Sequence, residues 1–168
     1  MALETVPVSS QSDGRWRIWN VPVGSNAKSV AIINGATSKS ITYGLTPDGW
    51  DVQTTQATVA DPRLTLIQNL TRPGKVDETA NLKAVASVTA DSADVVLSAL
   101  AVSGAISQFV VRRAVDNATT ATVGQVVDIY TGVIGVRRPD APVENGVDTV
   151  QFTLHLTSPT ERGAVLVA

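Results

Sequence analysis

Few side chains in this sequence could carry out catalysis. Among its 168 residues there is no cysteine and a single histidine, His155. A disulfide and a thiol nucleophile are therefore excluded, and one histidine is too few for the common zinc ligand sets. His155 is the only imidazole that could act as a general base, and it would need a nucleophile and an orienting group converging on it. No serine stands in a nucleophile-elbow sequence that would supply that nucleophile.

Paired carboxylates are the second chemistry to consider, because two of them can hydrolyse a glycosidic bond. The acidic candidates are Asp77, Glu78, Asp91 and Asp94. The first two are better explained as loop charge, and the last two as charges that cap a helix. The sequence contains neither a calcium-loop spacing nor a glycine-rich phosphate cradle. We therefore predict that the protein is not an enzyme and uses no cofactor or metal.

The basic residues include two doublets, Arg112-Arg113 and Arg137-Arg138. If 106–115 is a strand, Arg112 and Arg113 point to opposite faces, so one of them is directed toward a core, a lumen or an interface. Either its stem snorkels out to solvent, or it forms an ion pair with another subunit. The 13 basic and 15 acidic residues nearly balance, at a net charge of -2. This balance predicts no general attraction to nucleic acid or to an anionic membrane.

The composition favours strands. Charged residues make up only 17% and aromatic residues 4%, and Val, Ile and Thr are abundant. An average domain has about 25% charged residues, and β-branched side chains pack well on a pleated surface. A surface with so little charge must be kept wet by Thr, Ser, Asn and Gln, or be covered by another subunit. The length favours one domain, 1–168, with an N-terminal arm at 1–14 and an apolar C-terminal tail at 163–168.

No targeting or membrane segment is expected. The N-terminus lacks the basic and apolar regions of a secretory signal, and the longest apolar stretch, 95–111, is interrupted by serine, glycine and glutamine.

Hydrophobic periodicity predicts a mainly β fold with one helix. The helix is expected at about 91–103, with Asp91 as N-cap and Gly104 as the stop. Strand 148–157 has the clearest alternation, and the tail 162–168 should pair as a strand. The fold class is thus a β-sandwich or open barrel of about eight to nine strands flanked by one α-helix. The other expected strands are 15–21, 29–34, 37–43, 50–59, 63–71, 82–89, 106–115 and 125–136.

Two connections between these strands are informative. Asn34-Gly35 predicts a tight turn, so 29–43 is interpreted as a hairpin. In 63–71, Leu64, Leu66 and Leu70 fall on one face. The segment 72–81 contains Pro-Gly and most of the local charge, and its simplest interpretation is a solvated loop between two strands. It is longer than ordinary hairpin loops, and long loops are often binding elements.

The C-terminal part of the chain resembles the major tail tube protein of long-tailed, siphovirus-type bacteriophages, particularly phages of actinobacteria. The resemblance rests on an ordered set of segments in about residues 60–168, none specific by itself. These are the helix at 91–102, Phe109-Val110-Val111-Arg112-Arg113, the run 123–130, Gly135, the segment 139–142, Asn145, and a closing strand that ends at Pro159.

The resemblance implies a structural virion protein, made in the host cytoplasm, that forms stacked hexameric rings. One sheet of each subunit continues into its neighbours, and DNA leaves the capsid through the lumen without specific binding. Partners would be further copies of the chain and the tape measure, terminator and distal tail proteins, with no membrane. The loop that reaches the adjacent ring would contain Arg72, Pro73, Gly74, Lys75, Val76, Asp77, Glu78 and Thr79.

Two further sets of contact residues follow from this picture. A lumen for DNA should not grip phosphates, so polar uncharged strands suit its wall, although Lys39 would be an exception. The lumen-facing candidates are Lys39, Gln53 and Thr55. The candidates for contacts between subunits are Trp16, Trp19, Arg112, Arg113, Val165, Leu166 and Val167.

Other interpretations share the β-rich, weakly charged pattern. A capsid decoration protein or tail terminator is the nearest alternative. A β-sandwich binding module, such as an adhesion or carbohydrate-binding domain, would display an aromatic platform. The three tryptophans, Trp16, Trp19 and Trp50, are the only large platforms available, and such residues are more often core or interface anchors.

Overall fold

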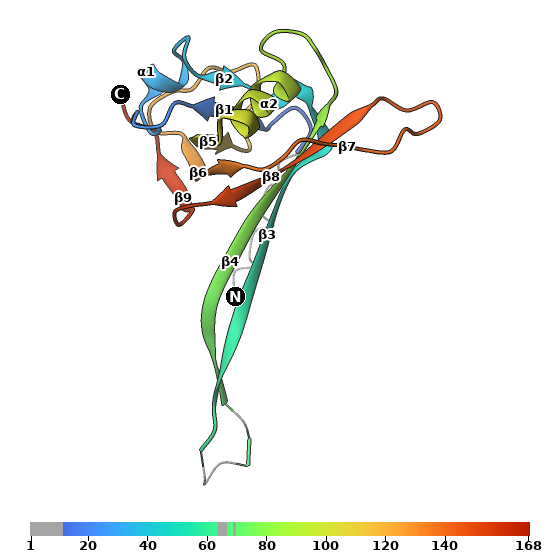
Figure 1. Ribbon diagram of the computed structural model, residues 1–168. Coiled ribbons are helices and arrows are strands. Elements are labelled where there is room, and N and C mark those ends of the chain that lie inside the picture. The colour runs from blue at the N-terminus through green and yellow to red at the C-terminus, as the bar shows by residue number, and fades with distance from the viewer. Residues whose placement is uncertain (1–11, 64–66, 69) are drawn as a thin grey trace, which may run out of the picture.

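The protein is a curled antiparallel sheet from which a long hairpin projects (Figure 1). The structure is a computed structural model that describes residues 12–63, 67–68 and 70–168. The strands of its nine-stranded sheet follow the order β2-β1-β5-β6-β8-β4-β3, with β7 added to β8 and β9 added to β6. The strands are β1 (Arg17–Val21), β2 (Lys39–Ser40), β3 (Leu45–Asp61), β4 (Leu70–Val85), β5 (Ile106–Arg112), β6 (Val126–Ile134), β7 (Arg138–Pro139), β8 (Thr149–Leu156) and β9 (Glu161–Val165). The helices are α1 (Val30–Ile33), the 3₁₀ turn η1 (Thr42–Gly44) and α2 (Ala93–Ser103). The predicted fold class is confirmed.

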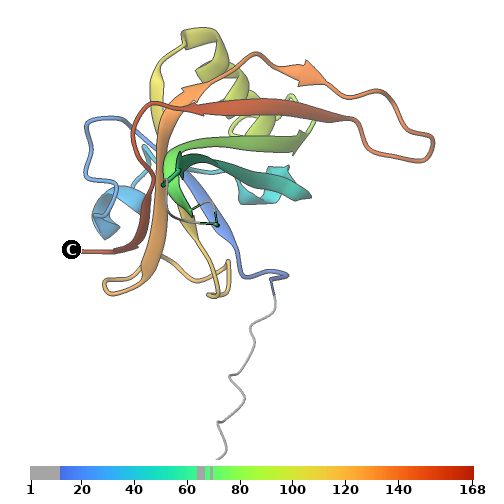
Figure 2. The ribbon, with the colours of Figure 1, turned by 90° about the horizontal axis from the view of Figure 1, so that it is seen from below.

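The sheet curls until its two ends approach, and this encloses the main core (Figure 2). Trp50 on the edge strand β3 meets Phe109 of β5 and Tyr130 of β6, with ring centroids 5.9 and 5.3 Å apart. Phe152 and Leu154 of β8 are fully buried in the same cluster. The alternation predicted for 148–157 is therefore confirmed, with apolar residues inward and Gln151 and His155 exposed.

Helix α2 packs over this core. Leu97 is fully buried, and Gly104 ends the helix in the left-handed conformation, as predicted. The N-cap is Ser92 rather than Asp91, because the Ser92 hydroxyl accepts from the Val95 N–H while Asp91 sits in the turn before it at φ 63°. This displacement by one residue places Asp94 inside the first turn, where it is buried.

A second cluster fills the other face of β1, β5 and β6. Trp19 of β1, Val110 of β5 and Leu166 of the C-terminal segment are buried there. Strand β9 pairs with β6, and Val167 bridges to Ser29, so the tail pairs as a strand, as predicted, and does so within its own chain.

The prediction of a hairpin over 29–43 is wrong. Its first half is the short helix α1, because the Asn34 side chain bonds the backbone of Ala121 through both its amide (2.9 Å) and its oxygen (3.1 Å). Asn34 therefore anchors a distant loop instead of forming a turn, and Ile33 turns into the second cluster. A short apolar run does not by itself distinguish strand from helix.

The prediction that 72–81 is a loop is also wrong. These residues belong to β4, where Asp77 lies opposite Thr55 and Arg72 opposite Val59 of β3. The Pro73-Gly74 pair stands at a register shift rather than at a turn, and a proline is tolerated at such an irregularity. The chain reverses between Asp61 and Leu70 instead. The predicted apolar face of Leu64 and Leu66 lies outside the described residues.

Candidate assembly surfaces

The hairpin of β3 and β4 leaves the body of the protein beyond Glu78 (Figure 1). Strand β8 accompanies β4 only from Val85 to Thr79, so residues 54–61 and 70–78 pair with each other alone. We call these paired residues the arm. An isolated two-stranded ribbon is marginally stable in water because it has no second layer to cover either face. The arm is thus the part of the fold that gains most from a partner.

The arm carries both apolar and basic side chains. Val59 is 55% exposed, Leu70 44% and Val76 51%. Asp61 binds Arg63 (3.1 Å) and Arg72 (2.9 Å), which joins the outer end of β3 to β4. Exposed apolar side chains beside such charges are typical of a contact surface rather than of a solvated strand.

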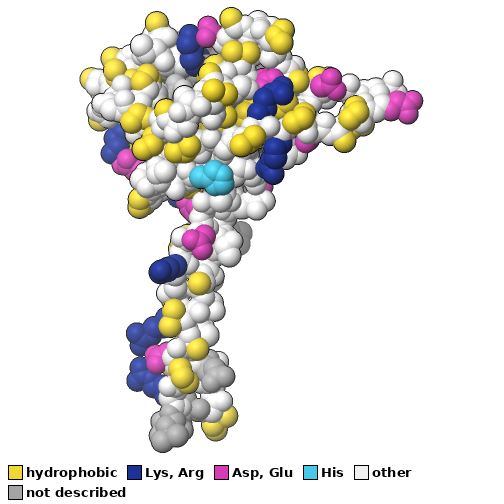
Figure 3. Space-filling model, viewed as in Figure 1, with side chains coloured by type: hydrophobic (Ala, Val, Ile, Leu, Met, Phe, Trp, Pro, Cys, Tyr) yellow, Lys and Arg dark blue, Asp and Glu magenta, His cyan; other side chains and the backbone are white. Residues whose placement is uncertain are grey.

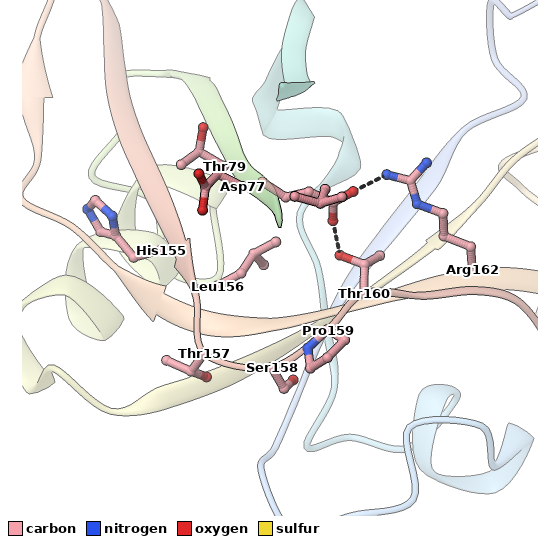
Figure 4. A pocket seen from close by; sticks show the side chains of 11 residues that line it. Asp77, Thr79, His155, Leu156, Thr157, Ser158, Pro159, Thr160 and Arg162 are labelled. Atoms are coloured by element: carbon pink, nitrogen blue, oxygen red, sulfur yellow. Dashed lines mark hydrogen bonds and ion pairs between the residues drawn. The ribbon is translucent and has the colours of Figure 1, made fainter. Parts of the chain in front are cut away.

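Glu78 fixes the arm to the body through Thr160 and Arg162, both of which are labelled in Figure 4. Its carboxylate accepts hydrogen bonds from Thr160 (2.6 Å) and from Thr54 across the hairpin (3.2 Å), and it pairs with Arg162. The Thr160 hydroxyl, followed by the positive charge of Arg162, lowers the pKa of Glu78, whereas burial opposes the shift. These bonds border an open groove of about 760 Å³ between β4 and the turn from β8 to β9. The direction of the arm is therefore set at its base.

The outward face of β3, β4, β8 and β7 is polar. Antiparallel register aligns its side chains in rows that cross the strands, and hydrogen bonds connect them. Thr153 accepts from Arg138 (3.2 Å) and donates to Asn81 (3.4 Å). We call this surface the polar face; its rows are Gln53–Thr79–His155, Asp51–Asn81–Thr153 and Lys83–Gln151–Arg138.

Charge on the polar face is largely neutralised within it. Lys83 lies 3.4 Å from Asp140 and 3.8 Å from Asp48. Asp140 also accepts from Thr149 and Gln151, both at 2.6 Å. The Thr149 hydroxyl makes the largest contribution to lowering the pKa of Asp140, so this carboxylate stays charged opposite Lys83. Such a surface offers a polyanion few free cations.

The lumen-facing candidates do not all lie together. Gln53 and Thr55 are two positions apart on β3, so their side chains lie on the same side of the strand, and Gln53 belongs to the polar face. Lys39 lies on β2 at the opposite end of the strand order, where it pairs with Asp91 at 3.0 Å. The structure therefore separates Lys39 from the other two residues.

The candidates for contacts between subunits are divided between core and surface. Arg112 is fully buried and Arg113 is half exposed, as their alternation predicted. The Arg112 guanidinium donates to the backbone oxygens of Asp116 and Thr119, both at 2.8 Å, and that of Arg113 pairs with Asp128. Both arginines thus have partners inside their own chain.

The aromatic and C-terminal candidates divide in the same way. Trp19 is buried, with the guanidinium groups of Arg17 and Arg112 over its ring, and Leu166 is fully buried in the same second cluster. Trp16 is partly exposed, Val165 is 51% exposed and Val167 43%. Only the last three could contact another subunit without rearrangement.

One projecting element, the connection between β7 and β8, has no counterpart among the sequence predictions. We call residues 140–148 the acidic loop, because Asp140, Glu144 and Asp148 are its only charged residues. It extends well away from the body (Figure 2), and Val143 and Val147 are 73% and 70% exposed. Asn145-Gly146 is a turn signal that could have revealed it.

Within the described ranges, the structure shows no group of three or more metal-ligating side chains and no helix long and apolar enough to cross a membrane. The fold and these surfaces define a β-rich protein whose distinctive features are a projecting arm and a polar sheet face.

Comparison with known proteins identifies the family. A model of the phage tail tube protein family matches residues 3–168, so the chain belongs to the phage tail tube protein family. It is therefore a structural, non-enzymatic component of the virion that forms the phage tail tube. No curated protein matches the sequence.

Among the solved structures that share its fold are a baseplate and a tail tube. One is described as the cryo-EM baseplate of the anti-feeding prophage, 6-fold symmetrised: the TM-score is 0.60 at 10% identity, over 95% of this chain and 96% of that one. The other is the SPP1 tail tube, with a TM-score of 0.58 at 12% identity, over 91% of this chain and 79% of that one.

Proposed function

We propose that the polar face of β3, β4, β8 and β7 lines the lumen of the tube. The observation that supports this assignment most is its composition: the rows across the four strands consist mainly of uncharged polar side chains, Lys83 is paired with Asp140, and Arg138 is the one cation in the rows that has no ion pair among the described residues. DNA phosphates bind wherever lysine and arginine are free, and a conduit for genome ejection must release the DNA at every step. Gln53 and Thr55 are then lumen residues, whereas Lys39 is not.

The same four strands provide the edges through which a ring closes. Strand β3 has β4 as its single partner, and β7 has β8. Pairing β3 of one subunit with β7 of the next continues the sheet, removes both edges and closes a barrel after a fixed number of copies. The relative described as 6-fold symmetrised supports six copies in each ring.

In this proposal the arm makes the contacts that stack one ring on the next. The contact set predicted from the sequence, 72–79, lies on β4 of the arm and at its base. Residues 72–77 are available to an adjacent ring, while Glu78 holds the arm in position. The whole chain acts as one domain, and its N-terminal segment 1–14, Trp16, Val165 and Val167 contribute further contacts between subunits.

The tube ends on other tail proteins of the tape measure, terminator and distal tail classes. The resemblance of the C-terminal segments supports an origin among siphovirus-type phages of actinobacteria, and sequencing the genome that encodes the chain tests this origin.

The arm can be removed without touching the polar face. Thr55 and Asp77 lie directly opposite each other, so residues 56–76 can be replaced by Asn-Gly, which closes a two-residue hairpin. We expect the shortened protein to form rings but no tubes under negative stain, whereas the full chain forms long tubes. Its body should unfold at the same denaturant concentration, because β4 keeps all its pairs with β8.

Two outcomes would contradict the proposal. Tubes of full length from the shortened protein would remove the arm from stacking. A full chain that stays monomeric at high concentration, even after seeding, would contradict ring formation itself.

A further inference from the structure

The arm and the acidic loop lie at opposite ends of one sheet. The register of β4 with β8 runs from Thr79 opposite His155 to Val85 opposite Thr149. The arm continues β4 beyond Thr79, and the acidic loop precedes Thr149, so the two elements leave the sheet in opposite directions along its strands. Figure 1 shows both projections from the body.

The acidic loop has unpaired charge. Glu144 near its turn and Asp148 at its base form no ion pair within the part of the chain that the structure describes, whereas Asp140 at the base is bound to Lys83. Val143 and Val147 flank Glu144 and are largely exposed. The loop therefore presents carboxylates together with small apolar side chains.

The arm presents the complementary set. It carries Arg72, Lys75 and, beside its end, Arg63, against Asp61, Asp77 and, at its base, Glu78, which is already bound to Arg162. Asp61 is already bound to both arginines, and Lys75 makes no ion pair with any described residue. The basic side chains stand along the arm in Figure 3, and acidic side chains stand at the loop. Val59 and Leu70 add exposed apolar surface.

We propose that the acidic loop of each subunit receives the arm of a subunit in the next ring. This inference rests on the proposed stacking function and names the surface that the arm contacts. Because the two elements differ and point in opposite directions, every ring offers loops on one side and arms on the other. Such a head-to-tail contact does not close, so it repeats along a tube. Each ion pair is weak in water, but a ring makes all its contacts together.

A charge exchange tests the pairing. In the variant Arg72→Glu/Lys75→Glu the arm repels the loop, and in Glu144→Lys/Asp148→Lys the loop repels the arm. We expect each variant to shorten the tubes at least tenfold in length under negative stain at low salt. A chain that carries all four substitutions should recover more than half of the normal length. Val102→Lys, which adds a charge on the exposed end of α2, is the control and should leave the length unchanged.

Proximity can be tested separately, because the chain has no cysteine of its own. A chain with Lys75→Cys and a second chain with Glu144→Cys are mixed, assembled and oxidised. We expect covalent dimers from the mixture and none from either chain alone. Replacing Glu144→Cys by Val102→Cys is the matched control, and it should give no dimer.

The outcomes separate this inference from the proposed function. If the shortened arm abolishes tubes but the loop variant forms normal ones, the arm stacks rings on another surface and the inference is wrong. The inference is equally overturned if the chain with all four substitutions forms tubes no longer than those of the two charge-reversal variants. It is also overturned if the cysteine mixture yields no dimer within assembled tubes. Normal tubes from the shortened arm would refute the stacking proposal as well.

Discussion

The guanidinium of Arg137 binds both carboxylate oxygens of Asp94, with Nε–Oδ1 and Nη2–Oδ2 distances of 2.8 Å. Asp94 is 3% exposed and also accepts from the Ser87 N–H (3.0 Å) and the Ser98 hydroxyl (3.1 Å). One carboxylate thus joins the segment after β6, the end of β4 and the first turn of α2. It holds the helix over the core of the sheet.

Asp94→Asn should destabilise the protein in a pH-dependent way. The bonds from Arg137 lower the pKa of Asp94 to about 2, against about 3.9 in an unfolded chain. A lowered pKa stabilises the fold above the unfolded value, by about 2 kcal/mol, and this stabilisation is lost as the pH falls from about 5 to 2. Urea unfolding of both proteins should therefore differ most at pH 7 and converge near pH 2. A difference that does not change with pH would contradict the assignment.

Arg112 should be among the residues least tolerant of replacement. It is fully buried, it donates four hydrogen bonds to the 116–125 region, and burial lowers its pKa. Arg112→Met removes all four bonds and leaves the Thr120 carbonyl oxygen without a donor among the described residues, so we expect a loss of about 3 kcal/mol in the free energy of unfolding. Arg112→Lys should recover little, because an ammonium cannot reproduce the guanidinium fork. Arg15→Met, at an exposed position, is the control; an equal effect there would contradict this role.

The fold class followed from the sequence because β-branched composition and alternation are local signals. Strand 148–157 and the helix before Gly104 were predicted correctly for that reason. The arm was not, since Pro73-Gly74 has the local signature of a turn, and only pairing with β3 keeps it in a strand. Likewise α1 depends on the bonds between Asn34 and Ala121, which are 87 residues apart.

The strand β6 approaches β8 closely at Gly132. A Cβ at this position would lie 2.3 Å from the His155 carbonyl oxygen, so Gly132→Ala must displace one strand. We expect a loss of about 2–3 kcal/mol. Gly163→Ala is the matched control: it has no atom within 4 Å of the added Cβ, and its φ of 69° costs about 1 kcal/mol. Denaturant midpoints for the two variants should differ clearly, and equal midpoints would contradict the close approach.

The candidate contact residues were harder to predict than the fold. Because side chains alternate along a strand, Gln53 and Thr55 must lie on the same side of β3. That alternation does not show which other strands share this side. The burial of Leu166 and Trp19 depends on the second cluster, which assembles from β1, β5, β6 and the C-terminal segment. The acidic loop was missed because a turn signal gives no information about how far a hairpin projects.

Adding charge to the polar face should make the tube retain DNA. If this face lines the lumen, Gln53→Lys on the face and Thr55→Lys, on the same side of β3 at the base of the arm, add two cations per subunit to the wall. Each phosphate contact steepens the salt dependence of binding. Sheared tubes of the variant should bind a short fluorescent DNA duplex in low salt and release it as salt rises, whereas tubes of the unmodified chain should bind little at any salt. The control, Val102→Lys/Ser103→Lys, places the same charge on exposed residues at the end of α2, which packs on the opposite side of the sheet. Stronger DNA binding by the control than by the variant would place the lumen on the other face.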